Sequence, residues 1–229
     1  MLEVLRFWLV VQLFALAALP LAWRLFGALP GRGYALAKPL GLLLVTYVLW
    51  MGGSLGLLRN SVGGVLASLA LVAAVSFWLG RGGLRRVDVQ DRSKGGETPE
   101  GGETPEGGET PPLQAWLRSQ WRLVLVTEVL FLAAVALWAF VRSYSPEITT
   151  AGGEKWMELT FLNGILRSES FPPLDPWLSG YAISYYYFGY VMLAALTQLS
   201  GLAPGVAFNV GLATWFGLVV VTAFAVAYD

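Results

Sequence analysis

Apolar and polar stretches alternate along most of the chain, and the apolar ones are long. Stretches of about twenty mostly apolar residues cover 7–26, 39–58, 62–79, 121–141, 183–202 and 205–228. An α-helix of about 20 residues crosses a hydrocarbon core of roughly 30 Å. The pattern therefore predicts an all-α fold, a polytopic membrane helix bundle with about six transmembrane helices.

The first apolar stretch, 7–26, has two interpretations. It is N-terminal and rich in Ala and Leu, which is typical of a cleaved signal peptide. However, Arg24 lies near its end, where a signal peptide would carry small residues at a cleavage site. We therefore expect a transmembrane helix here.

The polar stretch 80–120 contains an internal repeat. The motif Gly-Gly-Glu-Thr-Pro-Glu occupies 95–100 and 101–106, and a partial third copy begins at Gly107. Gly and Pro at this density, without apolar residues to bury, cannot offset the entropy that is lost on ordering. We therefore expect a disordered linker at 88–112.

This linker predicts a division of the chain into three parts. Residues 1–80 form an N-terminal three-helix membrane bundle, and 81–120 form the linker region. Residues 121–229 form a membrane core, which holds the remaining three predicted spans and the polar stretch 142–184.

Positive charges gather at two of the predicted loops. Because Lys and Arg are enriched in cytoplasmic loops, both loops are predicted to be cytoplasmic. Alternation then places the N-terminus and the stretch 142–184 outside the cell membrane, and this stretch holds more acidic than basic residues. The basic residues are Arg24, Arg32 and Lys38 in the first loop, and Arg81, Arg85, Arg86, Arg118 and Arg122 around the linker.

Composition narrows the chemistry that is open to the protein. The chain has no Cys and no His, so disulfides, thiolate chemistry and the commonest metal ligand are excluded. Any acid, base or metal ligand must be a carboxylate, with Tyr or Lys in support. The formal net charge is zero and predicts no nucleic-acid partner, whereas the apolar composition predicts membrane lipid as a partner.

Residues 154–167 have the periodicity of an amphipathic helix, which would lie along the outer membrane surface. Glu154 and Glu158 are four residues apart and therefore neighbours on one face of this helix. Two such carboxylates can bind a divalent cation such as Mg²⁺ or Mn²⁺, or leave one of them with a raised pKa as a general base. The alternative is a solvated face that pairs with Lys155 or Arg167.

The stretch then continues with a proline-rich segment at 171–177, whose three prolines exclude a helix interior. It predicts a rigid extended loop that presents Asp175. Tyr185, Tyr186 and Tyr187 follow at the outer edge of the next predicted span. They can line a binding site, or they can form only the aromatic belt that is expected at a membrane interface.

Glu128 lies inside the predicted span 121–141. An ionisable group at that depth usually faces a partner or a water-filled cavity. One interpretation of the chain is therefore a transporter or flippase-like component, in which Glu128 lines a path with Gln198 or Asn209. A further alternative is a structural membrane fragment without activity of its own.

A resemblance is carried by the run GGEKWMELTFLNGILRSESFPPLDPWLSGYAISYYYFGY, from Gly152 to Tyr190. It resembles the signature of the YYY membrane proteins, uncharacterised bacterial and archaeal multi-pass proteins that are grouped with type-C glycosyltransferases. Those enzymes take a sugar from a polyprenyl-phosphate donor at the outer membrane face. The resemblance implies that 121–229 begins a glycosyltransferase-like core and that the chain is the N-terminal portion of a longer enzyme.

The resemblance also implies roles for residues of the outer stretch. In type-C enzymes the first outer loop of the core carries an acidic motif that acts as the base or as a metal site. This sequence has Gly153-Glu154 in place of the usual Asp-Glu pair. The implied catalytic residues are Glu154, Glu158 and Asp175, and the implied ligands of the lipid-linked sugar and its phosphate are Arg142, Lys155, Arg167, Tyr185, Tyr186 and Tyr187.

Overall fold

A computed structural model describes residues 2–84, 113–148 and 153–229 of the chain. These residues form helices joined by turns and loops, without a strand, so the prediction of an all-helical fold is confirmed. The linker predicted at 88–112 lies outside the described residues. The helices are α1 (Leu2–Leu25), α2 (Ala37–Ser54), α3 (Val62–Leu84), α4 (Leu113–Ser119), α5 (Trp121–Ser143), α6 (Lys155–Arg167), α7 (Phe188–Ser200) and α8 (Pro204–Tyr228).

Four of the described helices are long and apolar enough to cross a membrane, namely α1, α3, α5 and α8. The predicted count of six transmembrane helices is not confirmed. The stretch expected at 183–202 is helical only in α7, whose 13 residues reach about 20 Å. The residues before α7 are held in a loop, because Asp175 N–H bonds to the Tyr181 carbonyl and Ile183 N–H to the Pro173 carbonyl.

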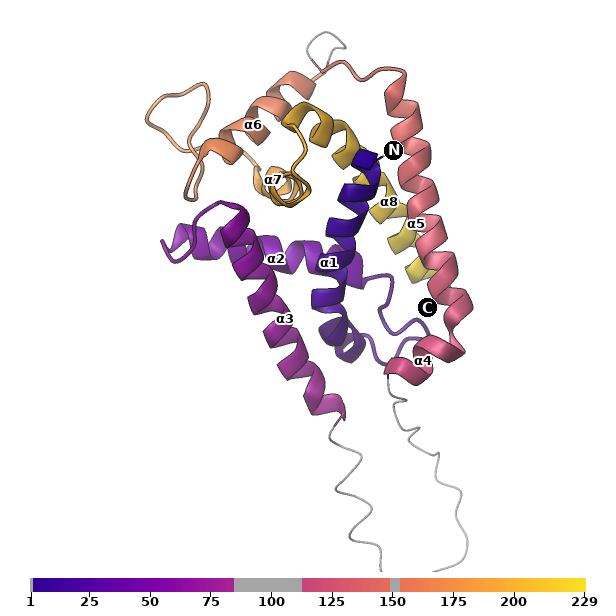
Figure 1. Cartoon of the computed structure of the whole chain (residues 1–229). Helices are drawn as coiled ribbons and strands as arrows, with labels where there is room; N and C mark the ends of the chain where they lie inside the picture. Colours follow the sequence, from indigo (N-terminus) through magenta and orange to yellow (C-terminus); the bar gives the residue numbers. More distant parts are fainter. Residues whose placement is uncertain (1, 85–112, 149–152) are drawn as a thin grey trace, which may run out of the picture.

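The long helices have defined relative directions (Figure 1). α1 and α3 run the same way, since Leu21 N–H donates to Ser76 Oγ and Arg24 donates to the Leu79 carbonyl near their C-terminal ends. α5 and α8 are antiparallel, because Arg142 at the end of α5 bonds to Asn209 in the second turn of α8. We call the end of the molecule that carries α6 the α6 end, and the opposite end, where α3 ends and α4 begins, the linker end (Figure 1).

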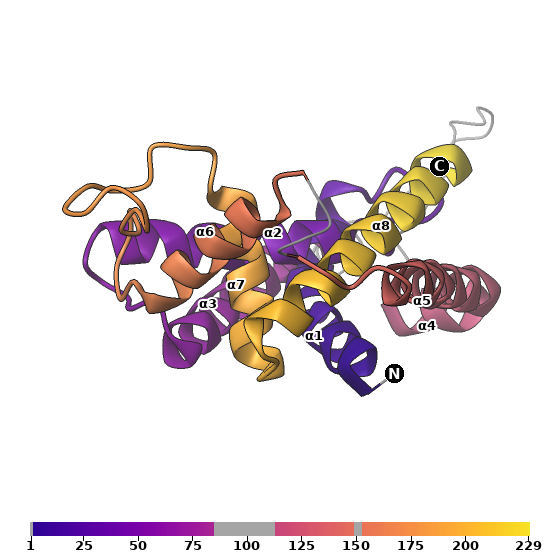
Figure 2. The ribbon, with the colours of Figure 1, turned by 90° about the horizontal axis from the view of Figure 1, so that it is seen from above.

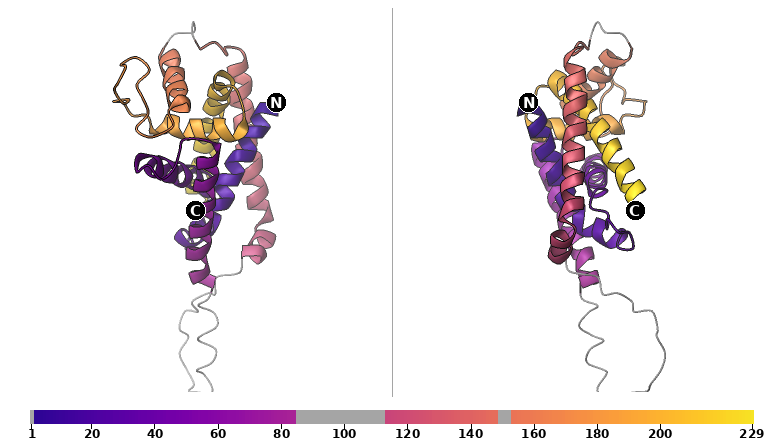
Figure 3. Two further views of the ribbon diagram at one scale, coloured as in Figure 1. Left: turned by 60° about the vertical axis from the view of Figure 1, so that its left-hand side comes forward. Right: turned by 90° about the vertical axis from the view of Figure 1, so that its right-hand side faces the viewer.

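α2 and α7 run across the long helices (Figure 3). α2 crosses α1 so closely that a Cβ on Gly41 would overlap the backbone carbonyl of Phe14. α1 lies at the centre of the assembly, where Phe7 and Phe14 are fully buried, and it contacts α2, α3, α5, α7 and α8. Seen from the α6 end, α6 and α7 cover one part of the bundle, and α5 lies beside α8 (Figure 2).

Candidate functional site

α6 begins at the stretch that holds the two predicted carboxylates. Glu154 is the N-cap residue and is exposed, whereas Glu158 lies in the first turn and is half-buried. Phe161, Leu162 and Ile165 are buried and lie three, four and seven residues after Glu158, so Glu158 borders the buried apolar face of an amphipathic helix. This apolar face gives α6 a fixed position at one end of the bundle, against α7.

The C-terminal end of α6 is tied to the turn between α2 and α3. The Asn60 side-chain amide donates to the carbonyls of Ile165 at 2.6 Å and Ser168 at 2.9 Å. The Asn60 side-chain oxygen accepts a hydrogen bond from Gln198 of α7 at 3.0 Å. Because Asn60 and Ser168 are buried, the bond from Asn60 satisfies a Ser168 carbonyl that would otherwise be desolvated without a partner, whereas the Ile165 carbonyl also accepts the Ser168 N–H at 3.1 Å.

Tyrosines surround the carboxylates of α6. The Tyr190 hydroxyl donates to Glu158 Oε1 at 3.3 Å, and the Tyr185 hydroxyl donates to the Tyr186 hydroxyl at 2.6 Å. The hydrogen bond with Tyr186 raises the pKa of Tyr185 to about 12, and the nearby charges of Glu154 and Glu158 add to the shift. We call Glu154, Glu158, Tyr185, Tyr186 and Tyr190 the acid-tyrosine cluster.

The three consecutive tyrosines do not act together. Tyr185 stacks on Phe161 of α6, with ring centroids 5.4 Å apart, and on Tyr186 at 3.9 Å. Tyr187 instead accepts a hydrogen bond from Trp50 Nε1 of α2 at 2.9 Å. The sequence therefore predicted two of the cluster's tyrosines, and a substrate contact by Tyr187 stays a prediction.

Two exposed tryptophans extend the cluster on the surface. The ring of Trp177 contacts Phe161 edge-on at 5.0 Å and Trp156 at 5.9 Å. About half of each indole is exposed, 52% for Trp156 and 49% for Trp177. Neither tryptophan nor Tyr190 was predicted as a site residue, because the contact between Trp156 and Trp177 depends on the path of the proline loop, and the contact between Tyr190 and α6 depends on α7.

Asp175 has a structural contact that its sequence position did not reveal. Its Oδ1 accepts the backbone N–H groups of Trp177 at 2.8 Å and Leu178 at 2.9 Å. These bonds close a turn in the loop that carries Trp177. A catalytic role for Asp175 stays a prediction, and the contacts support a role in shaping the loop.

The predicted basic residues are not paired with the acids of the cluster. In the described part of the chain, neither Glu154 nor Glu158 forms an ion pair with Lys155 or Arg167. Lys155 is half-buried and Arg167 is exposed. Arg142 donates from Nε to Asn209 Oδ1 at 3.1 Å, so it lies at the junction of α5 and α8.

The fit of a metal can be judged from the ligands that are present. Within 2–84, 113–148 and 153–229 there is no group of three or more acidic residues that could hold a metal ion. Glu154 and Glu158 would supply two carboxylates, whereas Mg²⁺ prefers an octahedral shell of oxygen ligands. A Mg²⁺ or Mn²⁺ ion at this site stays a prediction, and it would need further ligands from the substrate or from water.

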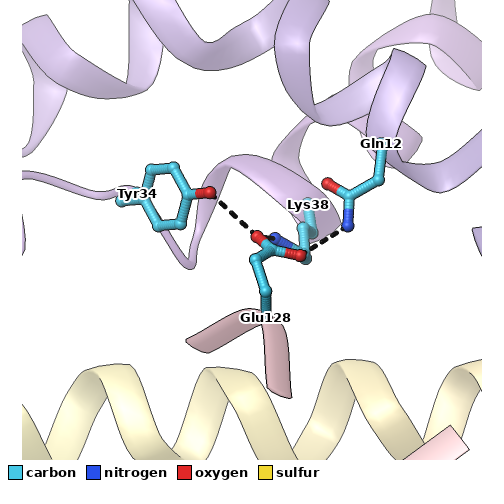
Figure 4. A network of polar contacts seen from close by, with 4 residues as sticks. All are labelled: Gln12, Tyr34, Lys38 and Glu128. Carbon is cyan, nitrogen blue, oxygen red and sulfur yellow. Dashed lines mark hydrogen bonds and ion pairs between the residues drawn. The ribbon is translucent and has the colours of Figure 1, made fainter. Parts of the chain in front are cut away.

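A second polar network lies between the long helices (Figure 4). Glu128 of α5 receives Lys38 Nζ at 2.5 Å, the Tyr34 hydroxyl at 2.9 Å and Gln12 Nε2 at 2.6 Å. The Lys38 side chain is 2% exposed and that of Glu128 is 23% exposed. Glu128 therefore faces a partner, and the partner is a buried ammonium group.

The three residues of the predicted transport path lie in separate networks. Glu128 bonds to Lys38, Gln198 bonds to Asn60, and Asn209 bonds to Arg142. The three donors around Glu128, from Gln12, Tyr34 and Lys38, all bond to its carboxylate, which is typical of a structural ion pair that joins helices. Transport through a path lined by these residues stays a prediction that their contacts do not favour.

Comparisons with known proteins place the chain in a membrane family. A family model described as "Uncharacterized membrane protein (DUF2298)" matches residues 44–229, which are 186 of the 229 residues. The match includes α3 to α8, most of α2 and the whole acid-tyrosine cluster. Searches of curated proteins and of solved structures gave no match.

Proposed function

The chain belongs to the DUF2298 family of uncharacterized membrane proteins, and from its geometry we propose that it is a polyprenyl-phosphate-sugar-dependent glycosyltransferase, or the N-terminal part of one. The acid-tyrosine cluster is the proposed active site. The observation that carries the proposal is the position of Glu158, half-buried on α6 and hydrogen-bonded to the Tyr190 hydroxyl.

This position suits a general base. The Tyr190 hydroxyl fixes the orientation of the Glu158 carboxylate, and the side chain is only half-buried, so an acceptor hydroxyl can reach it. In the proposed reaction Glu158 takes the proton of an acceptor hydroxyl, and the acceptor oxygen forms a bond to the anomeric carbon of the donor. The bond between that carbon and the phosphate oxygen breaks, and the polyprenyl phosphate leaves with the bonding electrons.

The surroundings of the two carboxylates support a sugar substrate. Trp156, Trp177 and Tyr185 offer flat apolar rings with polar edges at the surface of the cluster. Such rings pack against the apolar faces of sugars, while carboxylates and phenols accept and donate hydrogen bonds to sugar hydroxyls. Glu154 is exposed at the start of α6, where it is available for such contacts.

The proposed orientation places this site at the outer membrane face. The α6 end and the linker end lie at opposite ends of the long helices (Figure 1). The arginine-rich stretches around the linker favour the cytoplasm for the linker end. The acid-tyrosine cluster would then meet a lipid-linked sugar donor in the outer leaflet.

Glu158→Gln in the complete reading frame tests the proposal. Membranes that contain the protein would be incubated with a radiolabelled polyprenyl-phosphate sugar, and transfer would be measured as radiolabel that leaves the lipid fraction. Removal of a general base lowers the rate by about 10²–10⁴-fold. Glu154→Gln reports whether the second carboxylate is also required.

Glu169→Gln is the matched control. Glu169 lies two residues after α6, its side chain is 82% exposed, and among the described residues it forms an ion pair with Arg59, which is equally exposed. We expect transfer by this variant to match the wild type. Full transfer by both Glu154→Gln and Glu158→Gln would refute the assignment of the active site.

A further inference from the structure

A groove of about 460 Å³ opens at the α6 end, between the first turn of α1 and the junction of α5 and α8. Its volume is within the range of about 300–1,000 Å³ that is usual for small-molecule sites. Most of its lining is apolar, from Val4, Ala139, Phe140, Val206 and Val210. The groove lies apart from the acid-tyrosine cluster, because no residue of that cluster lines it.

One side of the groove carries positive charge. Arg142 uses Nε and one terminal nitrogen to bond Asn209 Oδ1, and Asn209 is itself fixed by donating to the Pro146 carbonyl at 3.1 Å. A guanidinium has five N–H donors, so this bond leaves donors of Arg142 for a ligand. Glu3 lines the groove from α1, which confines the positive side to the junction of α5 and α8.

The start of α8 adds to the positive side. α8 begins at Pro204 without a side-chain cap, and Gly205 and Val206 of its first turn line the groove. The first N–H groups of a helix have no partner within the helix, and together with the helix dipole they favour an anion. Arg142 and this helix start therefore offer a phosphate two independent sources of N–H donors.

From this arrangement we propose that the groove binds a phospholipid of the surrounding bilayer. The phosphate would lie between Arg142 and the start of α8, and an acyl chain would lie along Ala139, Val206 and Val210. Charge complementarity selects the phosphate, because guanidinium groups bind phosphate with strong charge-assisted hydrogen bonds. The apolar lining selects a chain, and a free phosphate in solution would gain nothing from it. This site is independent of the proposed transferase activity.

Native mass spectrometry of the full chain, titrated with phosphatidylglycerol in detergent, tests the proposal. We expect one lipid to bind to the wild type, and diacylglycerol, which has the chains without the phosphate, to bind at least about tenfold more weakly. Arg142→Gln should weaken phosphatidylglycerol binding by a similar factor. Arg59→Gln is the control for loss of a positive charge, because Arg59 is 82% exposed, and it should leave binding unchanged.

Gly205→Leu provides a second test that leaves the bond between Arg142 and Asn209 in place. A Cβ at Gly205 would have only the Ile148 side chain within 4 Å, at 3.9 Å, so a larger side chain can enter the groove without a backbone clash. It should block the acyl chain and abolish binding. Gly189→Leu is the matched control, because a Cβ at this glycine of α7 would meet nothing within 4 Å.

Three outcomes would overturn the proposal. The first is equal binding of phosphatidylglycerol and diacylglycerol, and the second is unchanged binding in both Arg142→Gln and Gly205→Leu. The third is displacement of phosphatidylglycerol by polyprenyl phosphate at a tenfold lower concentration, which would assign the groove to a different lipid.

Discussion

Loss of the Glu128 carboxylate should destabilise the protein more than loss of its lysine partner. Glu128→Ala leaves the Lys38 ammonium enclosed, with a side chain that is 2% exposed. Among the described residues, the ammonium would keep its contacts with the ring faces of Tyr34 at 5.2 Å and Phe131 at 5.7 Å. Breaking a buried ion pair from one side costs about 3–5 kcal/mol, and the cation–π contacts do not offset this cost, because they are present in the wild type too.

Loss of the lysine should lower the free energy of unfolding by less than loss of the glutamate does. In Lys38→Met the Glu128 carboxylate keeps two donors, the Tyr34 hydroxyl and the Gln12 amide, and it remains 23% exposed. We expect a loss of about 1–3 kcal/mol. The double variant Lys38→Met/Glu128→Gln removes both charges while an acceptor remains for Tyr34 and Gln12, so it should lie within about 1 kcal/mol of the wild type.

Unfolding in mixed micelles, followed by the fluorescence of the ten tryptophans, measures these differences. At roughly 2–4 °C per kcal/mol, Glu128→Ala should lower the midpoint of thermal unfolding by about 6–20 °C. Glu169→Ala is the control, since its ion pair with Arg59 is exposed on both sides and should contribute under about 1 kcal/mol. A double variant no more stable than the worse single variant would refute the reasoning.

Three further predictions concern the α6 end and the helix crossings. Asn60→Ala should cost about 1–3 kcal/mol, because it leaves the Ser168 carbonyl without its donor, while the Ile165 carbonyl keeps the Ser168 N–H at 3.1 Å. Proteolysis of the 143–187 segment should become faster, and unchanged proteolysis would contradict this. Gly41→Ala should cost about 2–3 kcal/mol in thermal unfolding, whereas Gly189→Ala, at an open position, should change stability by less than about 1 kcal/mol. The hydrogen bond from Tyr185 to Tyr186 should stabilise the fold below pH 10, and its contribution should be lost as the pH rises toward about 12. In the Tyr186→Phe variant, absorbance titration should show the pKa of Tyr185 falling back toward 10.

The periodicity of the sequence predicted the helices well, because apolar runs and the amphipathic pattern at 154–167 are local properties. The stretch 183–202 was predicted less well. Its residues up to Tyr187 are apolar or aromatic apart from Ser184, yet hydrogen bonds from Asp175 and Ile183 hold the proline loop and the start of this stretch together. Such long-range bonds leave no trace in periodicity, so α7 is shorter than the apolar run predicts.

The candidate site could be predicted only in part, for a related reason. Glu154 and Glu158 follow from helical spacing, and Glu128 follows from its depth in an apolar run. The roles of Tyr190 and Asn60 depend on contacts between distant segments. Tyr190 bonds to a residue 32 positions away, and Asn60 bonds to one 105 positions away. Lys38 was assigned to a loop by its charge, whereas the structure buries it beside Glu128, because the crossing of α1 and α2 at Gly41 brings it into the bundle.

The placement of the acid-tyrosine cluster outside the membrane underlies the proposed function, and cysteine labelling in intact cells tests it most directly. The chain has no cysteine of its own, so single cysteines can be introduced at exposed positions without background. Ser179 lies in the exposed loop between α6 and α7, Ser119 is the last residue of α4, and Tyr228 is the last residue of α8. α4 and the C-terminal end of α8 lie toward the linker end, whereas α6 lies at the other end (Figure 1). Ser168 is less suitable, because it is only 8% exposed.

An impermeant maleimide should label Ser179→Cys in intact cells, while Ser119→Cys and Tyr228→Cys should react only after permeabilisation. Protection of both Ser119→Cys and Tyr228→Cys from the maleimide in intact cells would place α8 antiparallel to α5 in the membrane, as their contacts require. Labelling of Ser119→Cys with protection of Ser179→Cys would reverse the orientation and remove the acid-tyrosine cluster from an outer sugar donor.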